Sequence, residues 1–124
     1  RTSARRVQSM GWRPDGGIWE LTRGGGVYLS NDTGLPEEDS DFTEARIGSR
    51  GFGLLDLGFT PSGKTFWTVG GSGSVFYSTD GGKKWKRDRG TDNVAANLYT
   101  VKFQNDRQGF VLGNDGVLLR YIGK

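Results

Sequence analysis

Arginine is the residue type in this chain whose abundance and spacing are best suited to binding chemistry. Eleven of the 17 basic residues are arginines, and a planar guanidinium group favours bidentate capture of a carboxylate or a phosphate. Seven of them lie early in the chain: Arg1, Arg5, Arg6, Arg13, Arg23, Arg46 and Arg50. We expect an anion-binding surface. The alternative is that these arginines are solvated and pair with the acidic residues of one predicted loop, Glu37, Glu38, Asp39, Asp41 and Glu44.

Several kinds of catalytic chemistry are excluded by residues that the chain lacks. It has no cysteine and no histidine, which removes Cys or His nucleophiles and bases and argues against a zinc or copper site. The net charge is a modest +3, and no apolar run is long enough to cross a bilayer. We therefore expect no catalytic residue, no metal site and no cofactor.

A motif of the form S-x-D-x-G-x-x-W, known as an Asp box, runs from Ser78 to Trp85. The oxygens of Ser78 and Asp80 can accept hydrogen bonds from turn amides, and Gly82 can adopt a positive φ that a side chain would resist. Trp85 then begins the next strand and can bury its ring between sheets. We interpret this Asp box as structural. A weaker copy without the tryptophan begins at Ser30.

Three further motifs are better explained by structure than by ligand binding. Residues 58–65 (GFTPSGKT) fit the phosphate-binding P-loop pattern, but a strand follows them where a helix is needed, so we predict a hairpin turn. The basic run at 83–89 (KKWKRDR) suggests nucleic acid, but strand alternation turns Trp85 inward and its lysine neighbours outward, so we predict a solvated outer strand and no nucleic-acid binding. The glycosylation sequon at Asn31 falls inside the weaker Asp box and is interpreted as turn chemistry.

Aromatic residues and glycines repeat along the chain. Three sets of positions recur at intervals of 43 to 48 residues: Trp12, Phe59 and Phe103; Trp19, Trp67 and Phe110; and Gly25, Gly73 and Gly116. A period in the forties that holds four short strands is typical of a β-propeller blade. The 22 glycines cluster between the strand-like runs, as the turns of an all-β protein do.

The repeat predicts an all-β fold, namely a β-propeller fragment of about three four-stranded antiparallel blades whose last blade lacks its fourth strand. We treat residues 1–124 as a single partial domain with blades at about 1–48, 49–96 and 97–124. The predicted strands are 5–12, 18–23, 26–30, 42–47, 53–60, 65–70, 74–79, 84–88, 98–104, 108–112 and 117–122. Residues 91–97 are predicted to form a loop or a single helical turn.

Propellers typically have about four to eight blades, so the repeat also predicts that this chain is the C-terminal fragment of a longer propeller. Alone, such a fragment would expose sheet faces and strand edges. We therefore expect it to dimerise or to exchange strands.

Longer stretches of the sequence resemble one family in particular. They are 5–19 (RRVQSMGWRPDGGIW), 23–30 (RGGGVYLS), 49–59 (SRGFGLLDLGF), 78–85 (STDGGKKW) and 97–121 (NLYTVKFQNDRQGFVLGNDGVLLRY). Together they are similar to the C-terminal blades of the photosystem II assembly and stability factor, a lumenal propeller protein of cyanobacteria and plastids. Sialidases and sortilin-type receptors also use Asp boxes, whereas the first and last of these stretches are much more specific.

The resemblance implies a seven-bladed parent with a non-enzymatic, chaperone-like role in the thylakoid lumen, peripheral to the thylakoid membrane. The partner would be the newly made photosystem II reaction-centre core subunit, including its precursor C-terminal region, in early assembly complexes. The family has an arginine patch on one face. Its motifs match this chain at Arg5, Arg6, Arg13, Arg23 and Arg50, with Arg46 as a neighbour.

Two other functions stay open from the residues alone. A sialidase-like glycosidase would also combine Asp boxes with an arginine set and a tyrosine nucleophile supported by a glutamate, although no such Tyr–Glu pair is recognisable here. A receptor-type propeller would bind peptides by the same electrostatic mechanism in another compartment.

Overall fold

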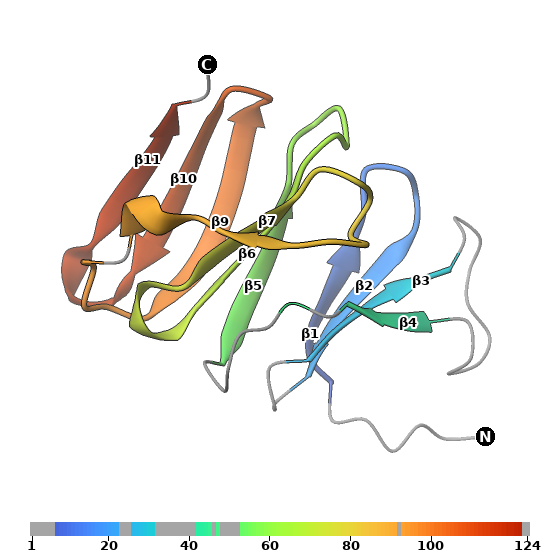
Figure 1. The fold of residues 1–124 in the computed structure, drawn as a ribbon, viewed down its shortest axis with the longest axis horizontal. Helices are drawn as coiled ribbons and strands as arrows, with labels where there is room; N and C mark the ends of the chain where they lie inside the picture. Colours follow the sequence, from blue (N-terminus) through green and yellow to red (C-terminus); the bar gives the residue numbers. More distant parts are fainter. Residues whose placement is uncertain are drawn as a thin grey trace.

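The computed structural model describes residues 7–22, 26–31, 42–45, 47, 53–91 and 93–122, which form an all-β structure (Figure 1). Its strands make three antiparallel sheets, which we call blades 1, 2 and 3. Blade 1 contains β1 (Val7–Trp12), β2 (Ile18–Thr22), β3 (Val27–Ser30) and β4 (Phe42–Ala45). Blade 2 contains β5 (Leu54–Phe59), β6 (Phe66–Gly70), β7 (Val75–Ser78) and β8 (Lys86–Arg87). Blade 3 contains β9 (Leu98–Asn105), β10 (Gln108–Gly113) and β11 (Leu118–Ile122).

The fold class predicted from the repeat is confirmed, because the described part holds two four-stranded sheets and one three-stranded sheet in chain order. The largest departure is in β8, which is only two residues long although 84–88 was predicted. The amide of Lys84 is bound to the Asp80 carboxylate, and this bond keeps the residue in the preceding turn. For residues 91–97, predicted as a loop or a single helical turn, the described residues 93–97 form a loop, and the 3-10 turn η3 (Arg89–Thr91) ends at the first residue of this stretch.

Apolar side chains fill the two seams between neighbouring blades. All five residues of β6 are buried, because this strand is central in its sheet and both faces of the sheet are covered. Phe66 packs into the seam with blade 1, whose core also includes Leu21. Trp67 and Val69 point the other way, into the seam with blade 3. The alternation of side chains along a strand therefore divides the apolar residues of blade 2 between two cores.

Strand register gives the blades two distinct ends. Val7 of β1 pairs with Thr22 of β2, and Val27 of β3 pairs with Ala45 of β4. We call the end at which these pairs lie the entry end, because each blade's first strand begins there; β5 and β9 begin at the lower side of Figure 1. Trp12 closes the β1–β2 turn at the opposite end, which we call the hairpin end.

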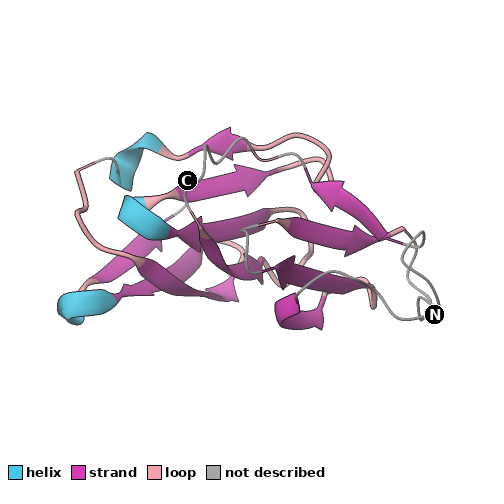
Figure 2. Cartoon of the chain, turned by 90° about the horizontal axis from the view of Figure 1, so that it is seen from below, coloured by secondary structure: helices cyan, strands magenta, loops and turns pink. Residues whose placement is uncertain are grey.

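Short 3-10 turns mark the entry end of blades 2 and 3. They are η2 (Gly71–Gly73), η3 and η4 (Asn114–Gly116), and Figure 2 draws them in cyan on the left of the molecule. Gly73 has a φ of 71°, and a Cβ there would lie 2.4 Å from the Val94 carbonyl oxygen, so only glycine fits. In the Gly-rich turn after β6, close backbone packing therefore requires glycine at position 73.

The outer faces of blades 1 and 3 remain partly apolar and exposed. On blade 1, Met10 is 60% and Trp12 is 66% exposed; on blade 3, Leu118 is 59% and Ile122 is 63% exposed. Exposed apolar side chains on these faces alternate in sequence with residues that point into the seams. None of the helical turns that the structure describes is long and apolar enough to span a membrane.

A half-buried carboxylate joins the first strands of blades 2 and 3. Asp56 of β5 accepts a hydrogen bond from the backbone N–H of Val101 on β9, at 2.9 Å. Burial raises the pKa of Asp56, and it outweighs the opposing effects of the Val101 N–H, the Lys102 charge and the Leu57 N–H. Ionisation of Asp56 is therefore less favourable in the folded chain than in the unfolded chain.

The first prediction concerns the pH dependence of this seam. Because the pKa of Asp56 is higher in the folded state than in the unfolded state, the wild-type chain gains stability as the pH falls from the folded pKa toward 3.8. Asp56→Asn keeps an acceptor for Val101 but cannot ionise. We expect the free energy of unfolding of the variant, relative to that of the wild type, to increase as the pH rises. Urea unfolding between about pH 4 and 7 measures this difference. A stability difference that is constant across this range would contradict the prediction.

Candidate partner-binding site

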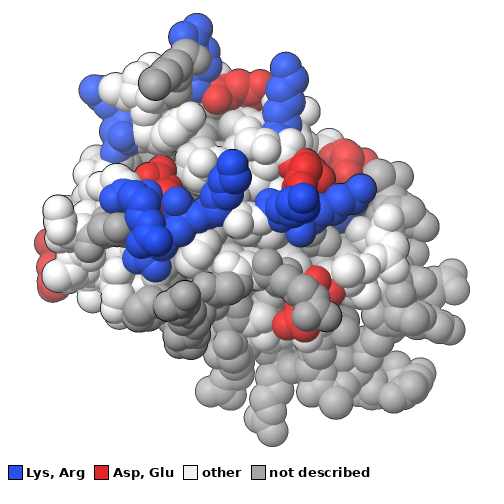
Figure 3. Space-filling view, in the orientation of Figure 1, with Lys and Arg blue, Asp and Glu red and all other residues white. Residues whose placement is uncertain are grey.

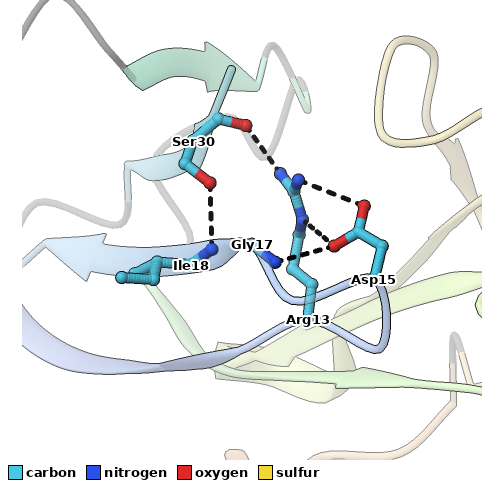
Figure 4. A network of polar contacts seen from close by, with 5 residues as sticks. All are labelled: Arg13, Asp15, Gly17, Ile18 and Ser30. Atoms are coloured by element: carbon cyan, nitrogen blue, oxygen red, sulfur yellow. Dashed lines mark hydrogen bonds and ion pairs between the residues drawn. The ribbon is translucent and has the colours of Figure 1, made fainter. Parts of the chain in front are cut away.

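Of the six predicted binding arginines, Arg13 is the one that lies among the described residues. It lies in the β1–β2 turn (Figure 4). Its Nε and Nη2 atoms donate to the two carboxylate oxygens of Asp15 at 3.0 and 3.2 Å. Its Nη1 atom donates to the backbone carbonyl oxygen of Ser30 at 2.8 Å. The residue is only 9% exposed. Arg13 therefore ties the hairpin end of β1 to the end of β3.

The surroundings of Arg13 are shaped to hold the guanidinium in place. The backbone N–H of Gly17 donates to Asp15, and a Cβ at Gly17 would lie 2.2 Å from an Arg13 nitrogen. Burial raises the pKa of Asp15, but the hydrogen bond and charge of Arg13 and the Gly17 N–H outweigh it, so the pKa is lowered. The Ser30 hydroxyl accepts from the Ile18 N–H at 2.9 Å. The weaker Asp box thus contributes its serine to this network.

The remaining predicted binding arginines cannot be placed in the same way. They are Arg5, Arg6, Arg23, Arg46 and Arg50, and they lie outside the described residues. The acidic loop that was considered as their counterpart is also outside, except for Glu44 on β4. For Arg13 itself, the described ion pair is with Asp15, two residues along the chain. Sequence reasoning missed this pairing, although the short i, i+2 spacing in a turn could have indicated it.

The Asp box of blade 2 forms a hydrogen-bonded corner. The Ser78 hydroxyl donates to the Asp80 carboxylate at 2.8 Å and accepts from the Gly82 N–H at 3.0 Å. Gly82 has a φ of 93°, and a Cβ there would lie 2.5 Å from the Leu29 side chain of blade 1. Trp85 donates from Nε1 to the Gly82 carbonyl oxygen at 2.9 Å and packs against the core between blades 1 and 2. These contacts give the motif a role in closing the blade.

One oxygen of the exposed Asp80 carboxylate accepts three hydrogen bonds, from the Ser78 hydroxyl and from two backbone amides. The Lys83 and Lys84 amides donate to the same oxygen of Asp80, at 3.1 and 2.9 Å. The Lys84 N–H and the Ser78 hydroxyl, followed by the Lys83 N–H, lower the pKa of Asp80 against a small opposing effect of burial. The group is therefore held as an anion that organises the turn.

The other motifs weighed from sequence have structural roles. Residues 60–65 of the P-loop-like stretch connect β5 to β6, and the Gly63 N–H donates to the Thr60 carbonyl oxygen at 2.8 Å, so the predicted hairpin turn is confirmed. The Ser62 N–H is already bound to Asp106 of blade 3, at 3.0 Å. Lys86 on β8 is exposed, as predicted for an outer strand. Figure 3 shows basic side chains, with acidic ones between them, across the face where β8 and η3 run in Figure 1.

Asn97 organises the entry end between blades 2 and 3. Its side-chain oxygen accepts from the Ser72 N–H at 3.2 Å, and its backbone N–H donates to the Asn114 side chain at 3.1 Å. Ser72 and Asp115 have positive φ angles of 56° and 59°. A shallow cavity of about 470 Å³ lies over Asn97 and the residues around it. Sequence reasoning did not single out Asn97, because nothing in its local pattern separates a turn residue from a bridging one.

The chain was compared with known protein families and structures. The model of one family, photosynthesis system II assembly factor YCF48, matches residues 1–122. The chain belongs to the YCF48 family. A chloroplastic photosystem II stability/assembly factor HCF136 from Arabidopsis thaliana is 58% identical to this YCF48-family chain over 123 residues, which are 99% of the chain and 30% of the relative. A photosystem II assembly lipoprotein Ycf48 from Synechocystis is 44% identical over 122 residues, which are 98% of the chain and 34% of the relative.

Solved structures agree with the assignment to the YCF48 family. A structure described as YCF48 bound to D1 peptide is 35% identical to this chain, with a TM-score of 0.83. The match covers all of this chain and 39% of the solved chain. The β-propeller domain of Cps50 (Swd1) from Myceliophteria thermophila is 14% identical with a TM-score of 0.59, which shows the β-propeller fold alone. The YCF48-family chain thus spans about a third of the length of the curated relatives named here.

The second prediction tests the structural role of Arg13. Arg13→Ala removes three hydrogen bonds and leaves the Ser30 carbonyl and the Asp15 carboxylate without this partner, so we expect a loss of about 1–3 kcal/mol in the free energy of unfolding. Because the pKa of Asp15 is lowered, this contribution is present above pH 3.8 and declines as the pH falls through the folded pKa. Arg107→Ala, on an exposed turn, is the control; equal losses in urea unfolding would contradict the prediction.

The third prediction concerns the Asp-box corner. Ser78 is 1% exposed, and Ser78→Ala removes the hydrogen bonds of its hydroxyl with Asp80 and with the Gly82 N–H. We expect a loss of about 1–2 kcal/mol in thermal or urea unfolding. The exposed neighbour gives a matched control, since Thr79→Ala should change stability by less than about 0.5 kcal/mol. If the two variants unfold alike, the corner does not stabilise the blade.

Proposed function

We propose that this chain is part of a non-enzymatic photosystem II assembly factor that binds the newly made reaction-centre subunit D1, including its precursor C-terminal region. The observation that carries this proposal is the match, over the whole of this chain, to a solved YCF48 bound to a D1 peptide. Relatives that are named as chloroplastic or cyanobacterial assembly proteins support the same role. The site of action would be the thylakoid lumen, peripheral to the thylakoid membrane, in early assembly complexes.

The proposed contact is an arginine-rich face at the entry end of the blades. Thr22 and Ala45 both lie at the entry end, and each is followed in sequence by an arginine, Arg23 and Arg46. Val7 lies at this end as well, and Arg5 and Arg6 precede it. Arg50 precedes Gly53, whose carbonyl oxygen accepts from the Gly71 N–H of η2. Five of the six predicted binding arginines are therefore sequence neighbours of one end.

Arg13 has a different part in this proposal. It follows Trp12 at the hairpin end, and its guanidinium is bound to Asp15 and Ser30. A buried guanidinium with this set of partners positions the β1–β2 turn and offers little charge to a ligand. The proposed contact therefore consists of Arg5, Arg6, Arg23, Arg46 and Arg50, with Arg13 supporting the fold of blade 1.

The mechanism would be electrostatic capture of an acidic or carboxylate-bearing segment. Guanidinium groups bind carboxylates in a bidentate manner, and a cluster of them that lacks internal acid partners is relieved by an anionic ligand. Because such pairs are exposed, they are screened by salt, and the affinity should fall as ionic strength rises. A synthetic peptide with the precursor C-terminal sequence of D1 is the appropriate probe.

The fourth prediction separates this face from the general charge of the chain. Arg23, Arg46 and Arg50 changed together to glutamine should weaken binding of the D1 precursor peptide about tenfold or more at low salt, as measured by calorimetry. The control changes three exposed basic residues of the hairpin end, Lys64, Lys83 and Arg107, to glutamine. It removes the same charge and should leave the affinity within about twofold. Equal weakening by both sets, or by neither, would refute the arginine-rich face.

A further inference from the structure

Three aspartates of the chain are directly followed by glycine: Asp15, Asp80 and Asp115. Such a pair can rearrange without an enzyme. The backbone nitrogen of the glycine attacks the carbonyl carbon of the protonated aspartate side chain, water leaves, and a cyclic succinimide forms. Water then opens the ring and gives either aspartate or isoaspartate, in which the main chain runs through the side-chain carboxyl carbon. Glycine leaves the attacking nitrogen accessible, because it has no side chain.

Two of the three carboxylates are held in place by hydrogen bonds. Asp15 accepts from the Arg13 guanidinium through both oxygens and from the Gly17 N–H. The nitrogen that would attack it is also engaged, since the Gly16 N–H donates to the Arg13 carbonyl oxygen at 3.0 Å. Asp80 accepts three hydrogen bonds on one oxygen. These bonds oppose rotation of the side chain toward the next nitrogen, and the lowered pKa of both groups makes the protonated form scarcer.

The third carboxylate has different surroundings. Asp115 is exposed and lies in η4, the turn between β10 and β11 at the entry end. Among the residues that the structure describes, none forms a hydrogen bond or an ion pair with its carboxylate. Its φ of 59° is a left-handed conformation that costs free energy for a residue with a side chain. A Cβ built on Gly116 would meet no atom within 4 Å, so the space beside the attacking residue is open.

The matching turn of blade 2 shows how such a turn is held when it is anchored. Ser72 has a similar φ of 56°, and its N–H donates to the side-chain oxygen of Asn97 at 3.2 Å. The Asp115 N–H has no comparable acceptor among the described residues. The η4 turn is closed at its base, where the Gly113 N–H donates to the Val117 carbonyl oxygen at 2.8 Å. The tip that contains Asp115 is therefore the least restrained of the three Asp–Gly pairs.

We propose that Asp115–Gly116 is a site of isoaspartate formation in the folded protein, and that the hydrogen bonds of the other two aspartates protect Asp15–Gly16 and Asp80–Gly81. The reaction releases water when the ring closes and takes up water when it opens, so it needs no oxidant and no second substrate. The product carries a free α-carboxylate, which is the group that an S-adenosylmethionine-dependent isoaspartyl methyltransferase esterifies.

Isomerisation would alter the entry end of blade 3, because it adds a methylene group to the main chain of η4. The neighbouring Asn114 is bonded to Asn97 in two ways: its N–H donates to the Asn97 carbonyl oxygen at 3.0 Å, and its side chain accepts from the Asn97 N–H at 3.1 Å. A longer turn would displace Asn114 and weaken both bonds. The change would act at the same end as the proposed partner contact, although its occurrence does not depend on that contact.

The fifth prediction compares the three sites within one molecule. The folded protein is incubated at physiological temperature, and isoaspartate is located by peptide mapping with mass spectrometry. We expect it to accumulate at Asp115 at least about tenfold faster than at Asp15 or Asp80, because breaking one hydrogen bond to an ionised carboxylate slows a reaction by about this factor.

Unfolding provides the matched control. In urea, where none of the carboxylates is held, the three pairs should rearrange at rates within about threefold of one another. Asp115→Glu keeps the charge but would need a larger ring that forms less readily, so methylation of the folded variant by labelled S-adenosylmethionine should fall to the level set by the other pairs. Arg13→Ala frees Asp15 from the guanidinium, so isoaspartate should rise at Asp15 in the folded variant and stay unchanged at Asp80.

Two results would overturn the proposal. One is isoaspartate at Asp15 or Asp80 in the folded protein at the rate found for Asp115. The other is modification of Asp115 in the unfolded chain but not in the folded protein, because the η4 turn would then protect it. Neither result depends on D1 binding, so the proposal can fail while the proposed function stands.

Discussion

Apolar packing between the faces of neighbouring blades is the interaction on which this structure depends. A short antiparallel sheet of three or four strands has two faces, and the central blade is stable here because both of its faces are covered. Trp67 and Val69 serve one seam while Phe66 serves the other, so alternate residues of a single strand build two separate cores. The Asp box, the hairpin turns and the Asp56 bond to blade 3 hold the sheets at the spacing that this packing requires.

The division of the blades into two ends has a functional consequence. Turns at the hairpin end are closed by internal bonds: Arg13 with Asp15 in blade 1, Ser62 with Asp106 between blades 2 and 3, and the Asp-box corner of blade 2. The entry end carries the connections between blades and is organised around Asn97. Closed turns at the hairpin end and connecting segments at the entry end are compatible with the proposal that a partner binds at the entry end.

Blade 2 shows how a fourth strand contributes to a seam between blades. β8 pairs with β7, and Trp85, which directly precedes β8, packs against the core between blades 1 and 2. On blades 1 and 3, some apolar side chains of the outer faces, such as Trp12 and Ile122, are exposed in the described part of the chain.

The sequence by itself determined the elements and their order. Strand alternation, glycine-rich turns and a repeat of 43 to 48 residues placed the strands to within two residues, because these patterns are local or periodic. The structural reading of the Asp box followed from the chemistry of Ser78 and Asp80. Tertiary structure alone decided which residues meet across blades. Arg13 was placed among the predicted binding arginines by its match to the family's motifs, and register puts it at the hairpin end, buried against Asp15 and Ser30. The roles of Asn97 and Asp56 likewise depend on contacts between distant segments, which a local pattern does not encode.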